Sequence, residues 1–370
     1  MRDGGRNWPD LPFAALAGAL VLFGLIMLTS ASWPLGFDRF HDGAYFVKHQ
    51  ILFGLLPGLV GFTAAYMIPY QQYRKWALPL FAFSVLLLLL VFVPGVGAEF
   101  GTSRSWISIA GISAQPSEIV KLTFLIYLAA WSESRAGNAM RDREASLIPF
   151  VLSLGAIVAL LLAQPDTGSM LIIACMAMAV YFVAGAPVGR FIGFSAIAAL
   201  GGLLLYKISP YRAARFTTFL HPELDPQGIG YHINQALLAI GSGGVFGRGY
   251  GHSLQKFQYL PEVAGDSIFA VIAEELGFFL TAGFIALYVA FLFAGIRIAE
   301  RAPDLFGRFL VTGVVAWFGV QAFMNIGAMV GVAPITGVPL PFVSYGGTAL
   351  AVSLTAVGLV LNVSRTSKAD

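Results

Sequence analysis

The chain has 370 residues, of which 58% are hydrophobic and only 11% are charged. Soluble domains carry about 25% charged residues, so this composition excludes a soluble globular enzyme and indicates an integral membrane protein. The net charge of +3 is too small to suggest nucleic acid as a partner. Cys175 is the single cysteine, which excludes an internal disulfide and a cysteine zinc cluster.

Ten apolar stretches approach the ~20 residues that a spanning helix needs, because lipid-facing backbone must satisfy its own hydrogen bonds. The predicted fold class is therefore an all-α integral membrane protein. It is a bundle of ten transmembrane helices forming one polytopic domain, residues 1–370. The first stretch lacks a small-residue cleavage site and is expected to be retained. The predicted spans are Leu11–Ser30, Tyr45–Ile68, Trp76–Val93, Glu118–Trp131, Leu147–Gln164, Gly168–Ala184, Phe191–Ile208, Asp266–Phe293, Phe306–Val332 and Ser344–Val363.

The longest polar interruption, residues 209–265, separates the seventh span from the eighth. A chain this apolar has little water-facing surface, so this loop and the neighbouring helix ends are the expected place for polar chemistry. Within it, Tyr231–Ile240 has apolar residues at helical spacing, which predicts a short helix lying in the membrane interface.

An even number of spans places both termini on one side of the membrane. Thirteen of the 22 lysines and arginines fall on that side. The positive-inside rule therefore predicts cytoplasmic termini and an extracytoplasmic loop at residues 209–265.

Two motifs near span ends carry charge. In Gln115-Pro-Ser-Glu-Ile-Val-Lys121, the three-residue spacing puts Glu118 and Lys121 on one helix face, where they can pair. The pair is either a local salt bridge with Lys121 reaching the interface, or part of a polar cavity between helices. In Gln164-Pro-Asp-Thr-Gly168, Asp166 or Thr167 is expected to cap the next helix, with cation binding by Asp166 as the alternative.

The long loop carries Arg212, Arg215 and Lys256. Arginine side chains match phosphate oxygens in bidentate fashion, so these cations are candidates for gripping a phosphorylated lipid on the outer face. Unspecific attraction to anionic headgroups is an equally good interpretation.

Asp266 stands where the loop becomes helix, with Glu262 nearby. It is either an N-cap or a partly desolvated carboxylate suited to act as a general base. Glu274 and Glu275 lie deeper in the same span and are expected to hydrogen-bond to neighbouring helices. Before the last span, the irregular segment Gly337–Gly347 can line a cavity, because lipid does not tolerate irregular backbone.

Five motifs in this order resemble the SEDS family (shape, elongation, division and sporulation), and the resemblance covers nearly the whole chain. Its QKFQYLPE and LPFVSYGG motifs look more like those of the division members than of the elongation members. The motifs are QPSEIVKL (115–122), AQPDTGS (163–169), DPQGIGYHINQALLAIGSGG (225–244), QKFQYLPE with DSIFAVIAEELG (255–277) and PLPFVSYGG (339–347).

The resemblance implies a ten-span peptidoglycan glycosyltransferase that polymerises lipid II outside the bacterial cytoplasmic membrane, at the division septum. It also implies a class B penicillin-binding protein as partner, contact with membrane lipids, and no organic cofactor. Asp266 matches the family's proposed catalytic aspartate, Glu118 and Lys121 match the charged pair of its central cavity, and Asp166 falls in another motif.

We expect Asp266 to deprotonate the acceptor sugar. Arg212, Arg215 and Lys256, with or without a divalent cation such as Mg²⁺ or Mn²⁺, would stabilise the pyrophosphate that leaves. A lipid II flippase and a non-catalytic division scaffold are the alternatives.

One departure from the family pattern concerns the residues around Asp266. The family usually has Leu-Pro-Glu-x-His-Thr-Asp-Phe, whereas this chain has Ala264, Gly265 and Ser267 in place of the histidine, threonine and phenylalanine. The aspartate is kept, but any duty of that histidine must be met in another way.

Overall fold

Apolar helices make up most of the fold in the computed structural model, which describes residues 9–100, 103–109, 112–208, 210–221, 224–225 and 227–366. Six helical segments in this part of the chain are long and apolar enough to cross a membrane, and three shorter apolar helices accompany them. The helices are α1 (Leu11–Phe40), α2 (Tyr45–Gln50), α3 (Leu56–Met67), α4 (Tyr70–Lys75), α5 (Ala77–Leu90), α6 (Pro116–Arg135), α7 (Ile148–Ala163), α8 (Thr167–Val183), α9 (Val188–Ile208), α10 (Pro210–Leu220), α11 (Ile229–Gly243), α12 (Ile268–Arg301), α13 (Leu305–Met329) and α14 (Gly347–Ser364).

Local sequence accounts for several helix boundaries. Asp10 accepts from the N–H of Phe13 at 2.9 Å at the start of α1, and Asp304 accepts from the N–H of Gly307 at 2.7 Å at the start of α13. These carboxylates satisfy N–H groups that have no partner inside the helix. A π-helical turn, Ile51–Leu55, joins α2 to α3, so the two helices form one continuous apolar segment of 23 residues.

The prediction of a purely α-helical chain is wrong in one segment. Strands β1 (Gly97–Phe100), β2 (Ser103–Ile109) and β3 (Ile112–Ala114) form an antiparallel sheet in the order β1-β2-β3. The sequence of β2, SRSWISI, places aromatic and β-branched residues at a spacing that suits a short strand. The three strands have only four, seven and three residues, and runs this short give no clear pattern in the sequence.

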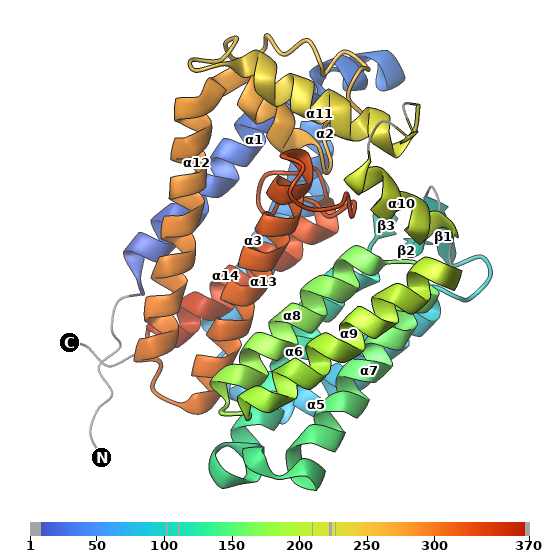
Figure 1. The fold of residues 1–370 in the computed structure, drawn as a ribbon. Coiled ribbons are helices and arrows are strands. Elements are labelled where there is room, and N and C mark those ends of the chain that lie inside the picture. The colour runs from blue at the N-terminus through green and yellow to red at the C-terminus, as the bar shows by residue number, and fades with distance from the viewer. Residues whose placement is uncertain are drawn as a thin grey trace.

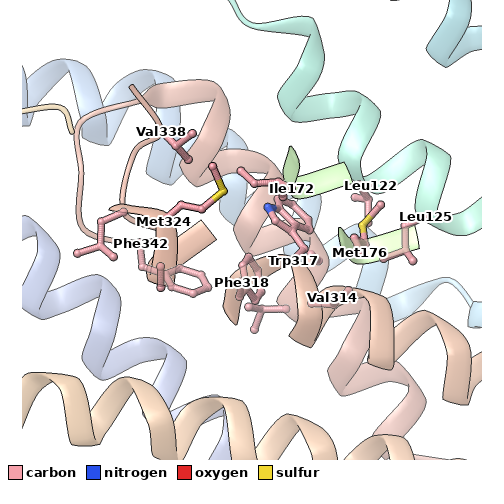
Figure 2. Close-up of a cluster of buried hydrophobic side chains, with 14 of the residues drawn as sticks. Leu122, Leu125, Ile172, Met176, Val314, Trp317, Phe318, Met324, Val338 and Phe342 are labelled. Carbon is pink, nitrogen blue, oxygen red and sulfur yellow. The ribbon is translucent and has the colours of Figure 1, made fainter. Parts of the chain in front are cut away.

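The hydrophobic core gathers around α13, which packs against α6, α8, α12 and α14. Figure 2 shows Trp317 and Phe318 among side chains from α6, from α8 and from the segment before α14. Lipid tails are as apolar as these side chains, so close packing rather than exclusion of water holds the cluster together. The other labelled members, all buried, are Leu122, Leu125, Ile172, Met176, Val314, Met324, Val338 and Phe342.

The start of α1 and the end of α14 meet on one side of the bundle, where the N–H of Asp10 donates to Oγ of Ser364 at 3.1 Å. At the opposite end, α11 lies across the bundle above α12 (Figure 1). Ile233, Ala236 and Ala239 form the buried face of α11. The predicted helix at Tyr231–Ile240 is therefore confirmed.

The eighth predicted span is not one regular helix, because α12 departs from helical geometry at Gly277, with φ 70° and ψ −175°. Backbone of the loop between α11 and α12 forms hydrogen bonds with the groups freed at this break. The N–H of Arg248 donates to the carbonyl of Glu274 at 3.0 Å, and the N–H of Phe278 donates to the carbonyl of Gly244 at 3.0 Å. A β-carbon at Gly277 would lie 2.1 Å from N of Gly247, so the approach requires glycine.

Candidate functional site

Asp266 lies in the turn that leads into α12. The backbone N–H groups of Gly265 and Ser267 donate to the carbonyl of Glu262 at 2.9 and 3.2 Å, which forms the turn. Ser267, not Asp266, occupies the N-cap position of α12, and this corrects the capping interpretation of Asp266. The Asp266 side chain is half-buried beside the helix start, and Glu262 is exposed.

A narrow cleft with an empty volume of about 150 Å³, too tight for a water molecule, adjoins Asp266 between α13 and the segment that precedes α14. Gly337 stands in this cleft with φ 69°, and a β-carbon there would lie 3.9 Å from Oδ2 of Asp266. The first residues of the predicted irregular segment Gly337–Gly347 therefore do line a cleft. Its lining consists of Asp266, Met324, Asn325, Ala328, Met329, Ile335, Thr336, Gly337 and Val338.

Two backbone-directed contacts hold the Asp266 turn in place. Asn325, which is 2% exposed, donates from Nδ2 to the carbonyls of Asp266 and Val338, both at 2.8 Å. The N–H of Tyr345 donates to the carbonyl of Ala264 at 2.7 Å. These hydrogen bonds join the turn before α12 to α13 and to the segment before α14.

A polar stripe continues from Asn325 along α13. Trp317, Gln321 and Asn325 are spaced four residues apart and so share one face of the helix. Oε1 of Gln321 accepts from Nζ of Lys121 at 2.8 Å and from Nε1 of Trp317 at 2.7 Å. Nε2 of Gln321 donates to the carbonyl of Pro339 at 2.8 Å. Gln321 thus links α6 to the segment that lines the cleft.

Glu118 and Lys121 of α6 form the predicted ion pair, with 2.7 Å between Oε1 and Nζ. Both side chains are buried, at 2% and 0% exposure, so Lys121 does not reach the membrane interface. Among the described residues, Oε2 of Glu118 and Oδ1 of Asn325 have no hydrogen-bond partner. Buried acceptors of this kind are places where water or a ligand can donate.

Asp166 caps α8 as predicted, because its Oδ1 accepts from the N–H of Ser169 at 3.0 Å. Its Oδ2 also accepts from Oγ of Ser117 at 2.8 Å and from Nε2 of Gln115 at 3.3 Å. Asp166 therefore ties the start of α8 to the start of α6, where the Glu118–Lys121 pair lies.

Residues 11–369 match the family described as cell cycle protein, which comprises FtsW, RodA and SpoVE. The chain belongs to this family. It is 40% identical over 355 residues to a protein of Trichlorobacter lovleyi named probable peptidoglycan glycosyltransferase FtsW, covering 96% of this chain and 93% of that one. It is also 40% identical over 368 residues to stage V sporulation protein E of Bacillus subtilis, covering 98% and 99%.

Solved structures of the FtsW/RodA/SpoVE family share the fold. RodA of Thermus thermophilus superposes with a TM-score of 0.72 at 29% identity, covering 98% of both chains. A chain of a peptidoglycan synthase complex, described for its coordination of polymerisation and crosslinking, superposes with a TM-score of 0.80 at 29% identity. That match covers 96% of this chain and 98% of the other.

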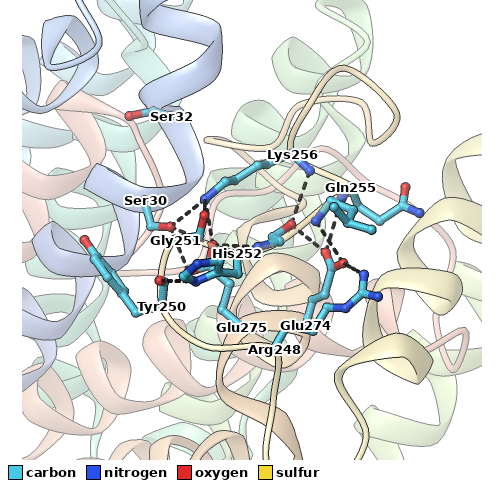
Figure 3. Close-up of polar contacts among 12 residues, drawn as sticks. Ser30, Ser32, Arg248, Tyr250, Gly251, His252, Gln255, Lys256, Glu274 and Glu275 are labelled. Atoms are coloured by element: carbon cyan, nitrogen blue, oxygen red, sulfur yellow. Dashed lines mark hydrogen bonds and ion pairs between the residues drawn. The ribbon is translucent and has the colours of Figure 1, made fainter.

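In this family member, two glutamates of α12 anchor the loop between α11 and α12 (Figure 3). Glu274 accepts from the N–H of Leu254 at 3.0 Å and from Nη1 of Arg248 at 3.2 Å. Glu275 accepts from Oγ of Ser30 in α1 at 2.6 Å. The expectation that both glutamates serve as hydrogen-bond acceptors is confirmed, and their partners come from the loop as well as from a helix.

Lys256 belongs to this anchor. Its Nζ donates to Oε1 of Glu275 at 2.8 Å, to the carbonyl of Gly251 at 2.8 Å and to Oγ of Ser30 at 3.0 Å. A lysine has three donors, and all three are used inside the protein. Lys256 therefore holds the loop in place, and its amine has no donor left for a ligand.

The other predicted cations are only partly placed. Arg212 and Arg215 lie in α10, and their side chains fall outside the described residues. In the part of the chain that the structure describes, no group of three or more His, Cys, Asp or Glu residues could hold a metal ion.

Two residues near Asp266 were not predicted from the sequence. His232 contacts Ser267, the serine that replaces the family's phenylalanine, and Asn325 positions the Asp266 backbone. The four-residue spacing of Gln321 and Asn325 in an otherwise apolar helix was a visible signal for the α13 stripe. The partners of His232 and Asn325 lie far away in the sequence, so no local pattern identifies them.

Proposed function

We propose that this chain is a peptidoglycan glycosyltransferase that polymerises lipid II at the outer face of the bacterial cytoplasmic membrane during cell division. The observation that carries the proposal is the half-buried carboxylate of Asp266, held at the end of the bundle beside a cleft. The FtsW name of the relatives that match 96% of the chain supports both the reaction and the division role.

A ten-span topology accompanies this function. The six long apolar segments, the three shorter ones and α6 together make ten. The contact between Asp10 and Ser364 places the start of α1 and the end of α14 on the same side, which is consistent with an even number of spans. The positive-inside rule makes that side cytoplasmic, so α11 and the Asp266 turn face outward.

The reaction transfers a glycan from one lipid-linked donor to an acceptor sugar. Asp266 removes the proton from the 4-hydroxyl of the acceptor as the oxygen attacks the anomeric carbon of the donor. The bond between that carbon and the pyrophosphate oxygen breaks, and undecaprenyl pyrophosphate leaves. A carboxylate within reach of the acceptor hydroxyl can take its proton, and the position of Asp266 beside the cleft suits it to this step.

Charge that develops on the pyrophosphate needs cations nearby. Arg212 and Arg215 in α10 are our candidates, because a guanidinium matches two phosphate oxygens at once. Lys256 is not among them, since its donors are used in the loop anchor.

A divalent cation fits this site only in company with the substrate. Asp266 offers one carboxylate, and Mg²⁺ is often held by one or two carboxylates together with substrate phosphates. Such an ion would neutralise charge on the pyrophosphate.

The remaining candidate residues have supporting roles in this proposal. Glu118 and Lys121 form a buried polar pair that Gln321 connects to the segment before α14. Asp166 fixes the start of α6 against α8. Glu262, exposed on the Asp266 turn, is positioned to meet the sugar or its peptide.

A class B penicillin-binding protein is the proposed partner, since glycan strands must be crosslinked after they are made. The likeness to a chain of a synthase complex in which polymerisation and crosslinking are coordinated supports this partnership. The exposed leucines of α9, Leu200, Leu203 and Leu204, are suited to contact lipid tails.

A flippase would need a polar path through the whole bundle. On the proposed cytoplasmic side of Lys121, however, most buried side chains of the same helices are apolar, such as Leu125, Leu128 and Val314. The buried polar ones in that part of α6, Thr123 and Ser132, are uncharged. This arrangement favours a polymerase working at one face over a transporter.

The deciding experiment is polymerisation of labelled lipid II by the purified protein, with and without its class B partner. We expect glycan ladders from the wild type and none from Asp266→Asn, which preserves size while removing the base. Asp38→Asn is the matched control, because Asp38 is an exposed carboxylate on the same side, bonded at 2.9 Å to Gln258 of the outer loop. Ladders from Asp266→Asn would move the base elsewhere. No ladders from the wild type under either condition would favour a flippase or a scaffold.

A further inference from the structure

A histidine of the outer loop contacts the residue next to Asp266. Nε2 of His232, in the first turns of α11, lies 2.6 Å from Oγ of Ser267. The same Oγ lies 3.5 Å from Oδ1 of Asp266. Ser267 is fully buried, at 0% exposure. The serine hydroxyl therefore stands between an imidazole and the candidate catalytic carboxylate.

Which group donates in each of these two hydrogen bonds depends on the single proton of the Ser267 hydroxyl. Ser267 has one proton to donate, and it can give that proton to His232 or to Asp266 but not to both. When His232 carries a proton on Nε2, its N–H donates to Oγ, and the Ser267 proton is left to point at Oδ1 of Asp266. Both the imidazolium and the Nε2–H tautomer of the neutral ring meet this condition.

We infer that His232 is a positioning residue for the glycosyltransferase reaction: it orients the Ser267 hydroxyl so that this hydroxyl holds the Asp266 carboxylate. The inference rests on the proposed function, in which Asp266 is the base. In this proposal His232 acts through Ser267 and not on the substrate.

The two residues that precede Asp266 cannot orient its carboxylate with their own side chains. Ala264 and Gly265, which precede Asp266, have no side chain that can form a hydrogen bond. The turn is held by its backbone instead, through Ala264 and Tyr345. The side chain that contacts Ser267 comes instead from a different element, His232 of α11.

The position of His232 is well fixed. Its neighbour Ile233 is 3% exposed, and Ala236 one turn later is 0% exposed, so this face of α11 is packed. α11 packs on α12, the helix that Ser267 caps. A hydrogen bond from a packed helix can hold a buried hydroxyl in one orientation, which a mobile loop could not do.

The test is a double-mutant cycle on lipid II polymerisation by the full chain with its class B partner. We expect His232→Leu to lower kcat about tenfold with little change in KM for lipid II, and Ser267→Ala to lower it similarly. The double variant should be no worse than either single variant, because both break one connection. His232→Gln, whose amide can still donate to Oγ, should retain most of the activity.

His252→Leu is the matched control. That histidine also lies in the outer loop, but it is exposed and contacts the carbonyl of Tyr250, so its loss should leave kcat unchanged. Apparent melting temperatures of all variants separate poor folding from poor turnover.

Three results would overturn the inference. Multiplying effects of His232→Leu and Ser267→Ala would mean that the residues act independently. A higher KM with unchanged kcat would mean that His232 binds substrate. Equal losses in His232→Gln and His232→Leu would mean that the imidazole itself is required. A wild type without activity would instead refute the proposed function and leave the cycle without a reference.

Discussion

The amine of Lys256 and a carboxylate oxygen of Glu275 lie 2.8 Å apart, with both side chains almost fully buried. Lys256 belongs to the loop between α11 and α12, and Glu275 lies within α12. Burying two charges costs nearly as much as their attraction returns, so the pair adds little stability by itself. Removing one partner, however, leaves a charge without compensation in a low-dielectric site.

Lys256→Met is therefore expected to destabilise the protein by about 3–5 kcal/mol, because Glu275 would remain buried and unpaired. The apparent melting temperature of the purified protein in detergent measures this. Lys256→Met combined with Glu275→Gln removes both charges and should recover part of the loss. If Lys256→Met instead melted like the wild type but bound lipid II weakly, the lysine would be a substrate contact.

Gly277→Ala tests the break in α12. A residue with a side chain is strained at φ 70°, at a cost of about 1–3 kcal/mol, and its β-carbon would also collide with the backbone of Gly247. We expect a marked fall in melting temperature. Gly283→Ala in the same helix is the control, since a β-carbon there meets nothing within 4 Å and alanine favours a helix by up to about 1 kcal/mol. Equal melting temperatures for the two variants would contradict the break.

Composition and spacing predicted the features that depend on neighbouring residues. Each spanning segment must satisfy its own backbone in lipid, so its apolar run is visible in the sequence. The Glu118–Lys121 pair lies within one helix turn, and Asp166 caps the helix that directly follows it. These interactions were predictable because each is confined to a few consecutive residues.

The features that were not predicted join residues far apart in the chain. The break at Gly277 exists because the loop between α11 and α12 returns to α12, and the approach of Gly247 is not encoded near residue 277. The contacts of His232 with Ser267 and of Lys256 with Ser30 likewise arise from packing. The sequence therefore made Lys256 a candidate to bind lipid phosphate or anionic headgroups, whereas its side chain is buried in the structure.

Neutralising Arg212 and Arg215 together, each to glutamine, should lower turnover on the order of 10²-fold if they stabilise the pyrophosphate that leaves. Lys207→Gln is the control, because Lys207 is an exposed cation at the end of α9, next to α10. Initial rates of polymerisation at two salt concentrations provide the measurement. Small, equal effects for all three substitutions that disappear at high salt would mean unspecific attraction to headgroups.

Substitution of two asparagines that donate to backbone carbonyls can distinguish an effect on stability from an effect on catalysis. Asn325 donates to the carbonyls of Asp266 and Val338, and Asn362 donates to those of Ala65 and Tyr66 at 2.8 and 3.1 Å. Replacing either with leucine leaves buried carbonyls without donors, which costs about 1–3 kcal/mol for each. Both variants should therefore melt at similarly reduced temperatures.

Their activities should differ, because only Asn325 fixes the position of Asp266. After correction for folded protein, Asn325→Leu should lose at least about tenfold in turnover, equivalent to ~1.4 kcal/mol in the barrier. Asn362→Leu should keep the wild-type rate. Equal rates in the two variants would show that the position of the carboxylate does not depend on the α13 contact.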